Sequence, residues 1–380
     1  MKLHSKLPDV GTTIFTVMSR MASDYGAINL SQGFPDFPMD KRLTSLVSRY
    51  MDEDYNQYAP MAGLPELLRT VADVVSSSYG YPSNADDEIT IMAGGTEALF
   101  SSISAFVHAG DEVIVFDPSY DSYDPAIRLC GGRPIRLALK PPSFSIDWDL
   151  VERSISPRTR MIMINTPHNP TGRIFHEDDL RSLERLVLRH GLLVLSDEVY
   201  ERIIFDGALH QSVLRYEGLR SQSIAAFSFG KTFHATGWKV GYTVAPANLT
   251  REIRKTHQFI TFSVNTPVQK GLSEYLKDPE HYTAIGDFYG KKRDFFLEQL
   301  KGSSFEPIPS NGTYFQLVSY RNLSSLPEMD MAVEMTQKHK VACIPVSVFY
   351  EYQENQQLLR FCFAKKEETL AGACDILRKL

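Results

Sequence analysis

The sequence predicts an α/β protein whose mostly parallel sheet is covered by helices on both faces, followed by a second, smaller α/β unit. Between about residues 88 and 245, short runs rich in β-branched and apolar residues alternate with helical stretches, as in βαβ units. Several of these runs are apolar at every position, which is typical of strands buried on both faces. After about residue 276 the pattern changes to a long charged helical stretch, shorter strands and a closing helix.

The elements follow in chain order. The first forty residues are rich in proline and glycine at SQGFPDFP, which indicates an arm and an entrance loop rather than a domain. We expect strands at EITIMAG, DEVIVFD, RMIMINTP, GLLVLSDEVY, SIAAFSFG and GYTVAP, and helices at GTEALFSSISAFVHAG and HEDDLRSLERLVLRHG. One helix is expected over EHYTAIGDFYGKKRDFFLEQLKG and another from about Lys365. The predicted parts are therefore an arm over 1–40, a large domain over 41–276 and a small domain over 277–380.

Composition excludes several classes of protein. The net charge is −6 and no basic block is present, so neither nucleic acid nor an anionic membrane is an expected partner. The four cysteines have no metal-ligand spacing and are expected to be free thiols in a reducing compartment: Cys130, Cys343, Cys362 and Cys374. The N-terminus lacks the apolar stretch of a signal peptide, and the longest apolar runs are too short to span a bilayer. We expect a soluble, cytoplasmic protein without a metal site.

Polar side chains follow three of the predicted strands. Asn165 and Asn169 lie at INTPHNPTG, Asp197 and Tyr200 at LLVLSDEVY, and Lys231 comes directly after SIAAFSFG. Because ligands bind at the carboxyl ends of strands in open parallel sheets, we expect an amide, a carboxylate and an amine at one edge. A lysine at the end of a buried strand is costly unless it is paired, neutral or covalently used.

A phosphate site is predicted beside these groups. AGGTEALF reads as a strand, glycines and a helix start, and the free backbone amides at Gly95 and Thr96 suit a phosphate at the helix N-terminus. Ser228 and Lys239 can add a hydroxyl and a cation to the same anion.

Each feature alone has an ordinary explanation. Glycine-rich helix starts are usually only turns, asparagines and aspartates commonly form turns, and most lysines are solvated. Together, however, a phosphate cradle, a carboxylate, a phenol, an amide and a buried lysine suit pyridoxal phosphate. The lysine would form an imine with its aldehyde. The carboxylate would keep the ring nitrogen protonated, so that the ring can act as an electron sink, and the amide and phenol would hold the ring oxygen.

Over essentially its whole length, the sequence resembles the class I aminotransferases of pyridoxal phosphate fold type I. The resemblance rests on SFGKTFHATGWKVGY, NTPHNPTG, SDEVY, NQYAPMAG, LSQGFPDF and LRFCFA, which occur in the expected order. SQGFPDFP, NQYAPMAG and IPVSVFY together are most similar to the methionine and glutamine/kynurenine transaminase branch. The resemblance implies a large domain with a mostly parallel seven-stranded sheet between helices, and a smaller α/β domain on which the N-terminal arm partly packs.

The resemblance also implies roles for individual residues. Lys231 would bind the cofactor and shuttle the proton, Asp197 would pair with the ring nitrogen, and the planar guanidinium of Arg360 would clamp the substrate α-carboxylate. The other implied roles are Asn169 and Tyr200 at the ring oxygen, Gly95, Thr96, Ser228 and Lys239 at the phosphate, Tyr120 on the ring face, Gly33 and Asn169 beside the carboxylate, and Phe15, Phe262 and Phe349 around the substrate side chain. Core packing is the alternative for each phenylalanine. Tyr58 would reach the phosphate of a neighbouring subunit in a homodimer with shared sites, or it is an ordinary loop tyrosine.

The implied activity is transfer of an amino group from an amino acid to a 2-oxo acid. No arginine stands out as a partner for a second substrate carboxylate, so the expected donors are uncharged, apolar or thioether L-amino acids: methionine, glutamine, aromatic amino acids and kynurenine-like compounds. A cysteine-conjugate C–S β-lyase on the same fold is an alternative, since the same lysine would abstract the same α-proton. A non-enzymatic pyridoxal phosphate-binding regulator is a second alternative, against which the chain shows no N-terminal winged-helix segment and no basic patch.

Overall fold

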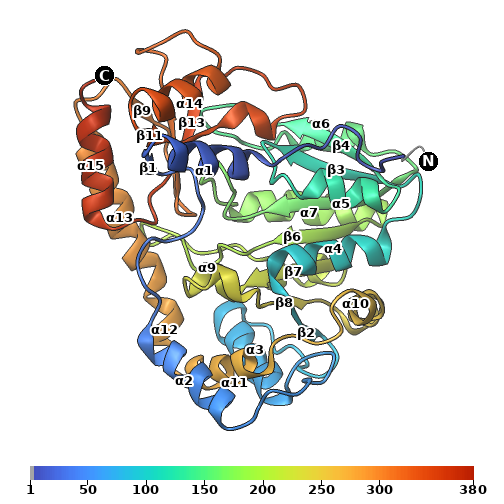
Figure 1. Ribbon diagram of the computed structural model, residues 1–380. Helices are drawn as coiled ribbons and strands as arrows, with labels where there is room; N and C mark the ends of the chain where they lie inside the picture. The colour runs from blue at the N-terminus through green and yellow to red at the C-terminus, as the bar shows by residue number, and fades with distance from the viewer. Residues whose placement is uncertain (1–3) are drawn as a thin grey trace.

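In the computed structural model, which describes residues 4–380, seven strands form one large sheet (Figure 1). In spatial order they are β2 (Ile89–Met92), β8 (Gly241–Val244), β7 (Ser223–Ser228), β6 (Leu193–Asp197), β5 (Thr159–Asn165), β3 (Glu112–Asp117) and β4 (Arg133–Ala138). Only β8 runs against its neighbours in this sheet, whereas β7, β6, β5, β3 and β4 pair in parallel. The predicted mostly parallel, seven-stranded α/β sheet is confirmed.

Alternating side chains of the central strands face two different helical layers. Met161 and Met163 of β5 pack in one apolar cluster with α4 (Gly94–Phe106), α5 (Tyr123–Leu129) and α10 (Ala247–Ile260). Ile162 and Ile164 of the same strand pack in another cluster with α3 (Pro65–Tyr79) and α7 (Glu177–His190). This period of two explains why the strands are apolar at every position, because neither face meets solvent.

The sequence pattern does not predict one strand of the large sheet. β4 lies at the edge of the large sheet and alternates arginine, proline and apolar residues. An edge strand has one unpaired side and one partly solvated surface, so it tolerates Pro134 and charged side chains that a central strand would not. Its composition therefore resembles a loop.

A four-stranded antiparallel sheet forms the second centre of the fold. In spatial order its strands are β12 (Ile344–Pro345), β13 (Leu358–Cys362), β10 (Phe315–Ser319) and β9 (Glu306–Pro307). The helices α13 (Ile285–Leu300), α14 (Glu328–Gln337) and α15 (Glu367–Leu377) lie beside it at the upper left of Figure 1. Tyr289, Phe296, Met335 and Leu370 of these helices share one buried cluster with Phe361 of β13.

The N-terminal arm contributes to the hydrophobic core around this four-stranded sheet. Its helix α1 (Ile14–Asp24) contributes Met18 to the same buried cluster. Its short strand β1 (Ile28–Asn29) pairs in parallel with β11 (Val341–Ala342). The first forty residues thus contain a helix and a strand as well as the expected loop.

The expected single helix over EHYTAIGDFYGKKRDFFLEQLKG is wrong as one element. The chain forms the one-turn helix α12 (Glu280–Thr283), and α13 begins at Ile285. Just after the break, Gly286 lies so close to the backbone of Ile204 that a Cβ would be 2.7 Å from its carbonyl oxygen. At Gly286, α13 therefore lies closer to the segment around Ile204 than a residue with a side chain would allow.

The other helices and turns complete the fold. They are α2 (Lys41–Asp52), α6 (Trp148–Ser154), α8 (Glu217–Arg220), α9 (Phe229–Thr232) and α11 (Thr266–Tyr275), with the 3₁₀ turns η1 (Val213–Arg215), η2 (Thr236–Trp238) and η3 (Val346–Phe349). Across residues 4–380, no helix has the length and apolar character needed to cross a membrane.

Candidate active site

A cavity of about 290 Å³ opens at the carboxyl edge of the large sheet. Residues that follow β5, β6 and β7 line one side, and residues of α1, β10 and β13 line the other. Twelve of the residues expected at the site line it: Phe15, Gly33, Gly95, Thr96, Tyr120, Asn169, Asp197, Tyr200, Ser228, Lys231, Lys239 and Arg360. Segments from both ends of the chain and from its middle therefore converge on one hollow.

Lys231 lies in α9, directly after β7, and its amine faces the cavity. Its Nζ is 5.6 Å from the ring centroid of Tyr200 and 5.8 Å from that of Tyr314. Burial lowers the pKa of this amine to about 8, against smaller opposing effects of Cys362 and Asp197. An amine with such a pKa is partly neutral near physiological pH and can act as a nucleophile or a base.

Asp197 ends β6 and is buried. Burial raises the pKa of its carboxyl to about 6, although Tyr123 and the backbone of Val199 stabilise the ionised form. The Tyr123 hydroxyl donates to Oδ2 at 2.6 Å, and the Val199 N–H donates to Oδ1 at 3.3 Å. A cation placed beside this carboxylate would recover much of the lost solvation.

Asn169 and Tyr200 lie next to these groups. The Asn169 N–H donates to Asn165 Oδ1 at 2.8 Å, and Asn165 Nδ2 donates to the carbonyl oxygen of Asp197 at 2.8 Å. Two neighbouring strand ends are thus joined by one side chain. Tyr200 is buried, and burial raises the pKa of its phenol, so that it stays a hydrogen-bond donor.

The end of the cavity formed by the start of α4 offers hydrogen-bond donors to an anion. Gly94, Gly95 and Thr96 open α4, and no side chain caps their amides. The approach is close, since a Cβ on Gly95 would lie 2.8 Å from Val199. Ser228 and Lys239 line the same end, and no carboxylate of residues 4–380 forms an ion pair with Lys239. Free amides, hydroxyls and one cation suit a phosphate.

Arg360 is the third basic side chain that lines the cavity, besides Lys231 and Lys239. It lies on β13, is fully buried and has no carboxylate partner within the described chain. Nη1 donates to Asn169 Oδ1 and Nη2 to the Ser31 carbonyl, both at 3.0 Å, while Nε has no partner. The ring of Phe315 lies 4.0 Å from the guanidinium carbon. A buried cation with unused N–H groups suits an incoming carboxylate.

Gly33 leaves space for the Phe315 ring beside Arg360. A Cβ at this position would lie 2.8 Å from Cζ of Phe315. Its carbonyl accepts the Tyr314 hydroxyl at 2.6 Å. Any larger residue here would push Phe315 away from Arg360.

Three expected site residues do not line the cavity. Phe349 lies behind it, 5.5 Å from the Arg360 guanidinium and 5.9 Å from the ring of Phe15. Tyr58 and Phe262 are exposed and pack edge to face at 5.4 Å. Within one chain these two residues form a separate aromatic pair.

Sequence reasoning missed several residues at or beside the site, among them Phe315, Tyr123, Leu99 and Gln32. Phe315 stacks on Arg360, Tyr123 donates to Asp197, and Leu99 and Gln32 line the wall. Tyr123 could have been found, because it lies three residues after Tyr120 in one motif. Gln32 belongs to SQGFPDFP, but nothing there predicts its bond to the Phe15 carbonyl at 2.9 Å.

The set of groups fits pyridoxal phosphate. The anion-binding end suits its phosphate, Asp197 suits its ring nitrogen, and Lys231 is an amine that can bond to its aldehyde. Arg360 is not needed for these cofactor contacts and has N–H groups free to bind another anion.

Comparisons with known proteins agree with this chemistry. The family model for aminotransferase class I and II matches residues 25–377. The chain is 50% identical over 378 residues to a methionine aminotransferase of Escherichia coli (strain K12), covering 99% of this chain and 98% of the relative. It is 32% identical to a kynurenine–oxoglutarate transaminase of Dictyostelium discoideum, with 97% and 94% covered. The crystal structure of YbdL from Escherichia coli, identified as having a methionine aminotransferase function, superposes with a TM-score of 0.98 at 49% identity and full coverage of both chains.

Proposed function

Because the chain belongs to the class I and class II aminotransferases, we propose that this pyridoxal phosphate-dependent enzyme takes its amino group from methionine and related uncharged L-amino acids. The proposed wider class contains glutamine, aromatic amino acids and kynurenine-like compounds. The acceptor is a 2-oxo acid of similar size.

The observation that carries this proposal is the charge inventory of the cavity. Arg360 is the only arginine among the described residues that line it. Lys231 and Lys239 have positions suited to the cofactor. Phe15 lies beside Arg360, and Phe34 and Leu99 also line the cavity, so a second substrate carboxylate would be left without an arginine partner. Apolar or thioether side chains suit these walls, in agreement with the methionine aminotransferase relative.

We propose the following roles for this chain's residues. When bound, the cofactor supplies an electron sink for the charge that develops at the substrate α-carbon. Arg360 holds the α-carboxylate and so fixes the orientation of the α-carbon. The Lys231 amine, with its pKa lowered to about 8, accepts the α-proton and delivers it again. Asp197 keeps a positive charge on the ring nitrogen by an ion pair in a buried site.

The remaining proposed roles concern binding. Asn169 and Tyr200 hold the ring oxygen, Tyr120 covers the ring, and the α4 N-terminus with Ser228 and Lys239 holds the phosphate. The chain divides, in this proposal, into an arm (1–40), a large domain (41–276) and a small domain (277–380). The four cysteines are free thiols, which supports a reducing, cytoplasmic location.

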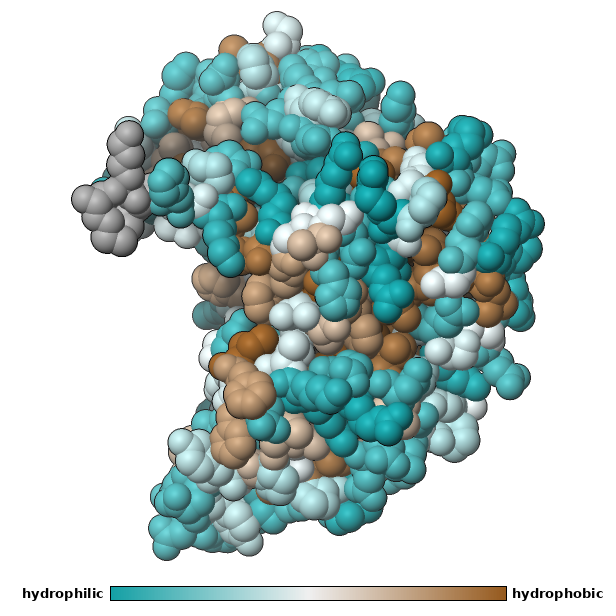
Figure 2. Space-filling view, turned by 90° about the vertical axis from the view of Figure 1, so that its right-hand side faces the viewer, coloured by the Kyte–Doolittle hydropathy of each residue, from teal (hydrophilic) through white to brown (hydrophobic). Residues whose placement is uncertain are grey.

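We also propose a homodimer with shared sites. Tyr58 is 83% exposed and Phe259 84% exposed, an unusual state for aromatic residues on a monomer surface. Ile260 and Phe262 lie in the same stretch of chain and are also exposed. Figure 2 shows apolar side chains along the hollow edge of one face of the molecule. In the dimer, Tyr58 would reach the phosphate of the partner's cofactor and Phe262 would line the partner's side-chain pocket.

A matrix of amino donors against 2-oxo acids, with detection of the new 2-oxo acid, tests the proposal. Methionine should exceed aspartate in kcat/KM. A preference for aspartate would refute the proposed substrate class. Formation of pyruvate from a cysteine conjugate without any added 2-oxo acid would instead reveal C–S β-lyase activity.

A further inference from the structure

Two aromatic residues beside Arg360 come from opposite ends of the chain. Phe15 lies in α1 and lines the cavity, while Phe349 ends η3 and lies behind Phe15. Their ring centroids are 5.9 Å apart. Phe349 therefore packs against Phe15, one of the residues that line the cavity.

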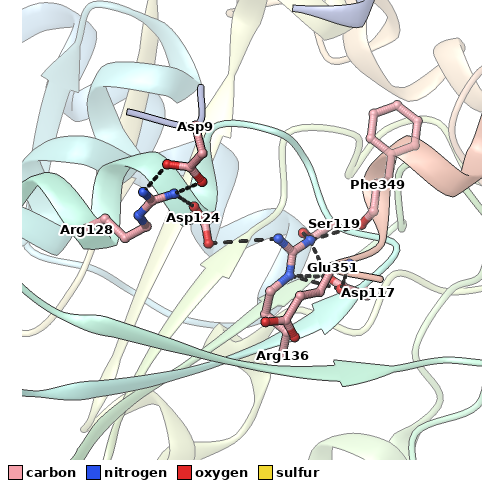
Figure 3. A network of polar contacts seen from close by, with 8 residues as sticks. All are labelled: Asp9, Asp117, Ser119, Asp124, Arg128, Arg136, Phe349 and Glu351. Carbon is pink, nitrogen blue, oxygen red and sulfur yellow. Dashed lines mark hydrogen bonds and ion pairs between the residues drawn. The ribbon is translucent and has the colours of Figure 1, made fainter. Parts of the chain in front are cut away.

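The backbone around Phe349 is fixed to the large sheet by a set of hydrogen bonds. The Phe349 carbonyl accepts the Ser119 N–H at 3.0 Å and Arg136 Nη2 at 3.1 Å. The next residues add two more bonds: the Tyr350 hydroxyl donates to the Leu139 carbonyl at 2.8 Å, and the Glu351 N–H donates to Asp117 Oδ2 at 2.9 Å. Figure 3 shows the ring of Phe349 pointing away from these polar contacts.

The centre of this set is a buried, forked ion pair. Arg136 Nε lies 3.0 and 2.9 Å from the two carboxylate oxygens of Asp117, and Nη2 lies 2.8 Å from Oδ1. The side chains are only 15% and 3% exposed. Such a planar fork fixes direction as well as distance, so the N–H that reaches the Phe349 carbonyl has a defined position.

The same chain of charges extends to the N-terminal arm. Arg136 Nη1 is 3.8 Å from Asp124, which accepts Arg128 Nη1 at 3.1 Å. Arg128 Nη1 also donates to Asp9 Oδ2 at 2.9 Å, six residues before Phe15. Figure 3 shows Asp9, Arg128, Asp124, Arg136 and Asp117 in this succession. The ion-pair network thus runs from Asp9 of the arm through α5 to β3 and β4, and one hydrogen bond from Arg136 joins it to the Phe349 backbone.

We infer that Arg136, paired with Asp117, is a positioning residue that sets the donor specificity of the site by fixing Phe349 behind the Phe15 wall. This inference rests on the proposed function, in which Phe15 contacts the donor side chain. Arg136 itself lines no part of the cavity, so it acts through Phe349.

Loss of the Arg136 contact should affect the part of the site that binds the side chain of the amino donor. The hydrogen bonds of Arg360 to Asn169 and Ser31 do not involve Phe349, and its ring contact with Phe315, at 4.0 Å, is closer than that with Phe349, at 5.5 Å. Loss of the Arg136 contact therefore leaves the α-carboxylate clamp in place and loosens the apolar wall. Methionine reaches that wall, whereas alanine does not.

The test is a double-mutant cycle on the loaded enzyme, read as the methionine-to-alanine ratio of kcat/KM with one acceptor. In Arg136→Met this ratio should fall about tenfold, the lower end of what one methylene of apolar contact contributes to selectivity. In a Phe349→Ala background, Arg136→Met should change the ratio by less than about twofold, because the partner through which it acts is already gone. Arg133→Met is the matched control: Arg133 is on the same strand, its side chain is 70% exposed and its nearest carboxylate, Glu112, is 3.9 Å away, so the ratio should not change.

Several outcomes decide the question. An unchanged ratio in Arg136→Met, or the same fall in both backgrounds, overturns the inference. Where Arg136→Met does not fold, Arg136→Lys gives the comparison, since an ammonium keeps the charge but cannot serve Asp117 and the Phe349 carbonyl together; its ratio should also fall. Absence of methionine turnover in the parent enzyme would refute the proposed function instead. The ratio of kcat/KM would then be measured between alanine and the large amino donor that the parent enzyme uses best.

Discussion

Replacement of Arg360 by lysine should weaken every amino donor by a similar factor. A guanidinium has five N–H donors. Two of them bond Asn169 and the Ser31 carbonyl at 3.0 Å each, and Nε has no partner. The unused N–H groups can form a forked pair with the substrate carboxylate, whereas an ammonium is a point charge that cannot keep the protein bonds and the fork together.

The magnitude follows from burial. Arg360 is fully buried, and burial lowers the pKa of its guanidinium, so a charge-assisted pair here is desolvated. Loss of such a pair costs about 2–5 kcal/mol, or about 30- to 5000-fold in kcat/KM. Because all donors share the α-carboxylate, methionine, phenylalanine, leucine and alanine should lose similar factors.

The assay is a kinetic matrix of these four donors against the parent, Arg360→Lys and Phe15→Ala. Phe15→Ala is the matched comparison, because it removes an apolar wall beside the guanidinium and leaves the charge in place; it should weaken the three larger donors far more than alanine. If Arg360→Lys discriminates among donors while Phe15→Ala does not, the carboxylate and side-chain ends of the site are reversed.

The remaining predictions concern the cofactor end and the dimer. Lys231→Ala should still bind pyridoxal phosphate, seen by its absorption after dialysis, but lose several orders of magnitude in turnover; near-normal turnover would exclude the assignment. Asp197→Asn should lose activity while the melting temperature changes little, since burial already disfavours its charge; unchanged kinetics would place the pyridine partner elsewhere. Without cofactor, Lys231→Met should be more stable than the parent at pH 7. The Lys231 amine has a pKa of about 8 in the folded protein and about 10.5 in the unfolded chain. Burial of the protonated amine therefore lowers the parent's free energy of unfolding by its full amount below pH 8, and this loss disappears as the pH rises to 10.5. A difference in thermal unfolding that does not depend on pH would contradict this. Tyr58→Ala should weaken cofactor retention without changing the monomer fold, and unchanged retention would remove Tyr58 from the partner's site.

The cofactor end of the cavity could be predicted because its groups are local to strand ends. Asn169, Asp197 and Lys231 each follow a recognisable buried strand, and the edge rule for parallel sheets brings them together without further information. The α4 N-terminus is a local signal of the same kind. The structure places all of these groups around one cavity.

Phe315 could not be predicted in this way. It contacts Arg360 because β10 pairs with β13 in a register that sets Leu317 opposite Arg360, which makes Phe315 a diagonal neighbour on the same face. Both strands are buried at every position, so neither has the alternation of buried and exposed residues that would specify the register. The predicted role of Phe262 in the side-chain pocket depends on a second subunit and stays a prediction.

The pairing of β1 with β11 has a consequence for synthesis on the ribosome. Ile28 leaves the ribosome roughly 300 residues before its partner Val341. At about 5–20 residues per second the wait is on the order of 15–60 s. During that time the strands from β2 to β8 are complete, and with them Asp197, Lys231 and the amides of α4, whereas β13 with Arg360 does not yet exist. The sheet edge proposed to hold the cofactor can therefore assemble in the nascent chain well before the arginine proposed to bind the amino acid has been synthesised.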